Sequence, residues 1–85
     1  MAISRIYSVK DELTGKFMNP FFIGDSETTE QEAIRIFKDN INNISIWKSN
    51  SQDFSLYQIG AMDDTTGHII GEVDKIIGGR AVLNE

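Results

Sequence analysis

Residues 53–60, DFSLYQIG, and residues 63–67, DDTTG, decide the fold of this chain. Apolar and polar side chains alternate along the first segment, as they do in a strand with one buried face. The second segment consists of turn-forming residues, and the apolar pair Ile69-Ile70 resumes beyond it. The stretch predicts an antiparallel hairpin whose turn uses Asp and Thr oxygens to accept backbone N–H groups, with Gly67 at a positive φ.

Two more strands are predicted nearer the N-terminus. Residues 3–10 alternate in the same way, with Tyr7 and Val9 sharing one face. Because Pro20 cannot donate a hydrogen bond to a neighbouring strand, a short strand or edge segment is expected just after it, at residues 21–23.

One main helix is predicted at about residues 30–42. Thr29 and Glu32 have the spacing of a capping box, and they precede an apolar face at helical spacing, formed by Ala33, Ile34, Phe37 and Ile41. Residues 44–47 follow either as a short strand or as a cover for the core. One helix with several antiparallel strands predicts an α+β domain, a small sheet packed against this helix.

The length of 85 residues predicts a single domain, 1–85, which buries only about two-thirds of its unfolded surface. The pair Gly78-Gly79 predicts a loosened tail over about residues 78–85. Since no cysteine is present to stabilise so small a core through disulfide bonds, we expect a homo-oligomer. No apolar run has the length of a signal peptide or of a membrane span, so we expect no membrane partner and a location in the cytoplasm.

The acidic balance of the chain argues against a strong general attraction to nucleic acid. Thirteen acidic residues against eight basic ones give a net charge of −5. The excess is concentrated after residue 48, where Lys75 and Arg80 are the only bases. The N-terminal part is close to neutral, so a weakly basic, aromatic surface there would bind with strong dependence on salt.

The residues with catalytic potential are few, and we expect neither an enzyme nor a cofactor. His68 is the only histidine, and no nucleophile motif or phosphate-binding glycine loop occurs. Asp53, Asp63, Asp64 and His68 have the chemistry of cation ligands. The ordinary turn chemistry of residues 63–67 is the stronger interpretation of the same residues, and no metal site is predicted.

Aromatic residues beside bases or amides offer a candidate surface for single-stranded nucleic acid. Such a surface needs cations for phosphates and rings on which bases stack. For any one ring, a place in an ordinary core is the alternative. The candidate nucleic-acid-binding residues are Tyr7, Lys10, Lys16, Arg35, Trp47 and Lys48.

Separated blocks of the chain resemble a viral family over roughly residues 5–70. These blocks are residues 6–11 (IYSVKD), Phe17 with residues 20–22 (PFF), Ala33 with Arg35 and Phe37, and residues 53–60 with Asp63-Asp64 and Thr66-Gly67. In their order and spacing they resemble the small nonstructural protein of gokushovirus-type microviruses, which are single-stranded DNA phages. The resemblance implies a protein made in the host cytoplasm during infection, with a role in viral DNA replication.

Two functions of different classes follow. In the first, the chain is a single-stranded DNA-binding accessory factor, or acts in the switch to single-strand synthesis and packaging. In the second, it regulates phage or host replication proteins through an acidic surface that includes Asp63, Asp64, Glu72 and Asp74, without contacting DNA. The family resemblance favours the first function, and the net charge favours the second.

Overall fold

The computed structural model describes residues 3–83, which form a five-stranded antiparallel sheet with one main helix and smaller helices. This is the α+β fold that the sequence predicts. The strands are β1 (Ile3–Asp11), β2 (Lys16–Phe17), β3 (Phe21–Gly24), β4 (Phe54–Asp63) and β5 (Ile69–Gly78). The helices are α1 (Thr29–Asn43), α2 (Ser45–Ser49), the 3-10 turn η1 (Ser51–Asp53) and α3 (Gly79–Leu83).

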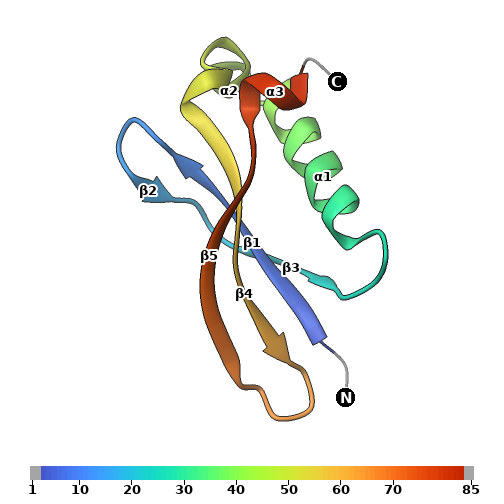
Figure 1. Cartoon of the computed structure of the whole chain (residues 1–85). Helices are drawn as coiled ribbons and strands as arrows, with labels where there is room; N and C mark the ends of the chain where they lie inside the picture. Colours follow the sequence, from blue (N-terminus) through green and yellow to red (C-terminus); the bar gives the residue numbers. More distant parts are fainter. Residues whose placement is uncertain (1–2, 84–85) are drawn as a thin grey trace.

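Strand β1 is the centre of the sheet. It pairs with β4 on one side, while β2 and β3 share its other side, so the order is β2-β1-β4-β5 with β3 also on β1. Figure 1 shows α1 lying along one side of the sheet, with α2 and α3 near the C-terminal end of α1. The tip of the β4–β5 hairpin lies at the opposite end of the molecule. Strand β5 therefore forms an edge of the sheet, and seven of its ten residues are exposed.

The core lies between the sheet and α1. Tyr7 and Val9 of β1 and Phe54 and Leu56 of β4 meet the helical residues Ala33, Phe37, Ile41 and Val82. The spacing of Ala33, Phe37 and Ile41 places all three on one stripe of α1, and each is fully buried. The apolar helix face predicted from the sequence is confirmed, with Ile34 packed at its margin.

The predicted hairpin is confirmed, together with its turn chemistry. The Asp63 carboxylate accepts the Thr65 N–H at 2.9 Å, and the Thr66 hydroxyl accepts the His68 N–H at 3.2 Å. Gly67 has φ +78°, which costs glycine little. In residues 3–83 no group of three or more potential ligands surrounds a metal-sized space, and the turn residues serve the backbone.

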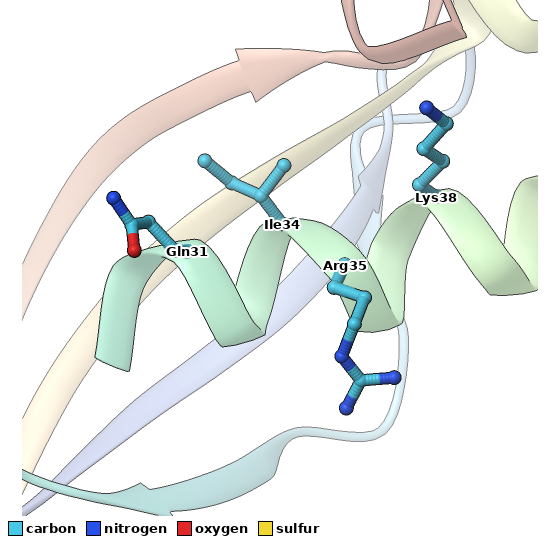
Figure 2. Close-up of a pocket in the computed structure, with 4 residues that line it drawn as sticks. All are labelled: Gln31, Ile34, Arg35 and Lys38. Atoms are coloured by element: carbon cyan, nitrogen blue, oxygen red, sulfur yellow. The ribbon is translucent and has the colours of Figure 1, made fainter. Parts of the chain in front are cut away.

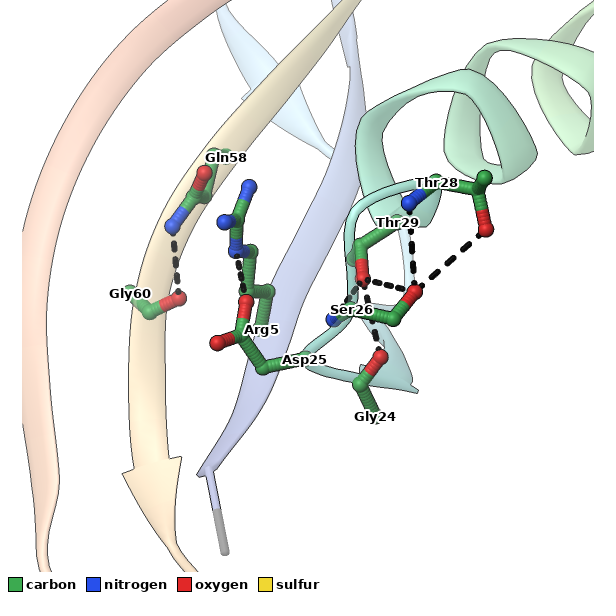
Figure 3. Close-up of polar contacts among 8 residues, drawn as sticks. All are labelled: Arg5, Gly24, Asp25, Ser26, Thr28, Thr29, Gln58 and Gly60. Carbon is green, nitrogen blue, oxygen red and sulfur yellow. Dashed lines mark hydrogen bonds and ion pairs between the residues drawn. The ribbon is translucent and has the colours of Figure 1, made fainter.

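The predicted capping box at the start of α1 is wrong. Thr28 occupies the cap position without a side-chain cap bond, and Thr29 is already the first helical residue. Figure 3 shows the reason: the buried Thr29 hydroxyl donates to the Gly24 carbonyl at 2.9 Å and accepts the Ser26 N–H at 2.6 Å. Thr29 thus ties the helix start to the end of β3 instead of capping α1.

Two further segments have different outcomes. Of the two alternatives for residues 44–47, a cover for the core is confirmed: residues 45–49 form the short helix α2, not a strand, and Trp47 packs against the core from it. The segment after Gly78 is not a loosened tail, because residues 79–83 form α3 and Val82 is fully buried in the core. Residues 84 and 85 lie outside the described part of the chain.

Candidate nucleic-acid interface

The two faces of the sheet have different surroundings. Alternation along β1 places Tyr7 and Val9 toward α1 and the residues between and beyond them, Ser8 and Lys10, on the other side. We call this second side the open face, since the helical residues of the core cluster all lie on the Tyr7 side, although Ile6, Ser8 and Ser55 on it are buried.

Three aromatic side chains follow β1 along the open face. Phe22 of β3 is paired with Ile6, Tyr57 of β4 with Ser8, and Phe17 of β2 with Lys10. Directly paired residues share a face, so the three rings lie on the same face of the sheet, Phe17 and Phe22 on one flank of β1 and Tyr57 on the other. Phe22 is 50% exposed and Phe17 is 41% exposed, which leaves both rings accessible.

A cation lies over two of these rings. The ammonium group of Lys10 is 5.5 Å from the ring centroid of Phe17 and 5.5 Å from that of Tyr57. The two rings meet edge to face, with their centroids 5.4 Å apart. A lysine held between two rings provides a positive charge and stacking surfaces at one place.

A single carboxylate organises the polar side of this cluster. Glu12, in the turn after β1, accepts the Tyr57 hydroxyl at 2.9 Å and forms ion pairs with Lys10 at 3.4 Å and with Lys75 of β5 at 3.6 Å. Its backbone N–H donates to the Asp53 carbonyl at 2.7 Å, which fixes the turn beside β4. Together, Lys10, Glu12, Phe17, Tyr57 and Lys75 form what we call the open-face cluster.

The contacts of Glu12 shift two pKa values in opposite directions. The hydrogen bond from Tyr57, aided by bonds from Ser55 and Lys10 and by the charge of Lys10, holds the pKa of Glu12 below its ordinary value. Partial burial of the phenol, together with its bond to the Glu12 carboxylate, raises the pKa of Tyr57. Both shifts favour the arrangement of a charged carboxylate and a neutral phenol at neutral pH.

The stability of the fold should reflect this carboxylate. Because the pKa of Glu12 is lower in the folded state than in the unfolded state, the charged carboxylate stabilises the fold at pH values above 4.5, its ordinary pKa. This stabilisation is lost as the pH falls through the lower pKa of the folded state. We expect the Glu12→Gln variant to melt slightly below the wild type at pH 7, and the difference in Tm to shrink as the pH falls below 4.5. Thermal melts from pH 7 to pH 3 measure this, and a gap that widens toward low pH would contradict it.

Two of the aromatic and basic residues selected from the sequence pack into or against the core. Tyr7 has no exposed surface and stacks on Phe21, with ring centroids 5.9 Å apart. Trp47 is half-buried and stacks on Phe54 at 4.8 Å. Tyr7 is therefore not available to a base, because its strand position faces α1, and Trp47 serves mainly to cover the core.

Burial of Tyr7 leads to a clear expectation for its hydroxyl. This oxygen is buried and forms no well-aligned hydrogen bond among the described residues, although its contact with the Arg5 side chain raises the pKa of Arg5. Because an unsatisfied buried hydroxyl costs stability, Tyr7→Phe should raise the free energy of unfolding by about 1 kcal/mol. Urea unfolding of the two proteins measures this; a clear loss of stability in the variant would mean that the hydroxyl has a partner.

The predicted bases do not converge on one surface. Lys10 belongs to the open-face cluster, whereas the exposed Lys16 pairs with Asp11 and so lies on the opposite face of the sheet from Lys10 and Phe17. Arg35 lies on α1, where it pairs with Asp39 at 3.2 Å and with Glu32 at 3.8 Å. Together with Gln31, Ile34 and Lys38, Arg35 lines a surface hollow of about 350 Å³. Figure 2 shows that the Arg35 side chain points away from those of Ile34 and Lys38. Lys48 is exposed on α2.

Five residues of the open-face site were not among those selected from the sequence: Glu12, Phe17, Phe22, Tyr57 and Lys75. Alternation along β1 carries part of the missing signal, because it separates Lys10 from Tyr7. Tyr57 lies in the predicted strand before the turn, where the alternation of residues 53–60 places it on one face of the sheet. The pairing of Lys75 with Tyr57 depends on register shifts in the β4–β5 ladder, and no local pattern encodes these.

Comparison with known proteins identifies one family. The family model described as Phage ORF5 protein matches residues 4–82. Searches of curated proteins and of solved structures found no significant match. Within residues 3–83, no helix is both long and apolar enough to cross a membrane.

Proposed function

Because the chain belongs to the Phage ORF5 protein family and is a bacteriophage protein, we propose that it binds single-stranded DNA on its open face during viral DNA replication. The sequence resemblance to gokushovirus-type nonstructural proteins supports this role in a single-stranded DNA phage. The protein would act in the host cytoplasm as an accessory factor, or in the switch to single-strand synthesis and packaging.

One observation supports DNA binding most strongly: the ammonium group of Lys10 lies over the rings of both Phe17 and Tyr57. Single strands are bound without sequence preference where aromatic rings stack on bases and nearby cations contact phosphates. Phe22 adds a third ring on the same face, and Lys75 provides a second cation. Exposed rings suit the unpaired bases of a single strand better than a duplex, whose bases are stacked inside.

The net charge of −5 limits the strength of this interaction. The average field of the protein repels phosphate, so attraction depends on the few cations at the site. We therefore expect micromolar affinity at low salt and a shallow slope of log affinity against log salt, since only a few phosphates are neutralised.

A titration with labelled oligonucleotides tests the proposal. A short single strand and the matching duplex are titrated at 20 and 150 mM salt, and fluorescence anisotropy is recorded. We expect saturable binding of the single strand that weakens with salt, and weaker binding of the duplex. No anisotropy change with single-stranded DNA at 100 µM protein and 20 mM salt would overturn the proposal.

The β4–β5 hairpin favours a second function, regulation of phage or host replication proteins without contact to DNA. Glu72 and Asp74 are exposed on the edge strand, next to Ile69, Ile70 and Val73, which are 60%, 71% and 61% exposed. An unpaired edge with apolar side chains is a common means of adding a strand from a partner. Binding to such a partner would respond weakly to salt, which distinguishes it from binding to phosphates.

A further inference from the structure

One hydroxyl and two ammonium groups, from three strands, converge on the carboxylate of Glu12. These are the hydroxyl of Tyr57, at 2.9 Å, and the ammonium groups of Lys10 and Lys75, at 3.4 and 3.6 Å. Two cations and a hydroxyl around one group of oxygens are also the donors that a phosphodiester needs. The open-face cluster is thus an assembled anion site with a side chain of the protein in it.

Occupation by Glu12 has a direct electrostatic consequence. While the carboxylate pairs with Lys10 and Lys75, it offsets much of their attraction for an approaching phosphate. A bound strand can use both lysines fully only if its phosphate replaces the carboxylate. The two anions therefore compete for the same donors.

The position of Glu12 allows such an exchange. Its backbone is fixed by the bond from its N–H to the Asp53 carbonyl, while its side chain, 30% exposed, reaches the site from the turn after β1. The carboxylate can turn into solvent without any change in the strands. Its donors, in contrast, lie on β1, β4 and β5 and stay in register.

We propose that Glu12 occupies the site of a DNA phosphate and is displaced by it, so that Glu12 weakens binding of single-stranded DNA and keeps it reversible. This inference rests on the proposed function and specifies its control. Glu12 acts as a built-in competitor, and its removal uncovers a stronger site.

The Glu12→Gln variant tests this competition, with Asp64→Asn as the matched control. Both changes remove one negative charge and keep the shape of the side chain, but Asp64 lies at the tip of the hairpin, far from the cluster. We expect Glu12→Gln to bind a labelled single strand about five- to tenfold more tightly than wild type at low salt, and Asp64→Asn to change the affinity less than twofold. Circular dichroism verifies that both variants are folded.

The titration of Glu12 itself provides a second measurement. The side-chain carboxyl carbon of Glu12, followed by NMR, reports its pKa in the free protein and in the complex with single-stranded DNA. Displacement removes the contacts with Tyr57 and Lys10 that lower this pKa and brings phosphate nearby, so the pKa should rise on binding.

The outcomes separate the competition from DNA binding itself. If wild type binds single-stranded DNA, but Glu12→Gln binds no more tightly and the pKa of Glu12 stays unchanged in the complex, the competition is refuted and DNA binding stands. If neither protein binds DNA at any salt, both proposals fail. If only Glu12→Gln binds, Glu12 blocks the site in the wild type, which refutes both the proposed function and the reversible displacement of Glu12.

Discussion

A double variant in which both Lys10 and Lys75 are changed to glutamine is expected to bind single-stranded DNA about 30-fold more weakly at low salt. These lysines supply the two ammonium groups of the open-face cluster, one of them over the rings of Phe17 and Tyr57. The loss of two phosphate contacts should also make the slope of log affinity against log salt shallower. The expected change is about 1.4 for single-stranded DNA and about 1.8 for a duplex. Anisotropy titrations at four salt concentrations measure both quantities.

A control with the same change in charge locates the effect. Lys38 lies on α1 and Lys48 on α2, away from the open face, and neither forms an ion pair among the described residues. Changing both to glutamine should lower the affinity less than threefold, through the loss of general attraction alone. Equal losses in the two double variants would show that binding depends on net charge, not on the open face.

Local patterns account for most of the fold. The alternation of residues 53–60 and the turn residues after it correspond to β4 and the hairpin, and the apolar spacing of Ala33, Phe37 and Ile41 corresponds to the buried stripe of α1. These features depend on neighbours in sequence, where periodicity is informative. The helix cap was misjudged because Thr29 bonds to Gly24, a tertiary contact that the capping-box spacing does not reveal.

The candidate site could be predicted only in part, because it is assembled across strands. Lys10 was selected from the sequence, but Tyr7, selected with it, points to the opposite face of the same strand. Glu12 and Lys75 meet only because β1 and β5 flank β4 in a particular register. Such register depends on bulges and long-range pairing, so composition can suggest the kind of site but not its members.

The other large expected effect concerns Gly79, where β5 ends and α3 begins. A Cβ atom on this residue would overlap the Ser51 carbonyl oxygen and would lie 2.8 Å from the Ile41 Cδ1 and 3.0 Å from the Phe54 carbonyl oxygen. Two of these three neighbours are backbone atoms, which cannot turn aside. The close approach of α3 to η1 and α1 therefore depends on a residue without a side chain at this position.

Gly79→Ala is accordingly expected to lower the free energy of unfolding by about 3 kcal/mol, or the Tm by roughly 15 °C. The methyl group would push α3 outward, and Val82, which is fully buried, would leave the core with it. Gly78→Ala is the matched control, because its Cβ would meet only the Ser55 Oγ, at 4.0 Å, and should shift Tm by no more than a few degrees. Thermal melts of the two variants measure the contrast. If the two substitutions cost the same, residues 79–83 do not hold the core as the structure indicates, and the loosened tail predicted from the two glycines would be the better description.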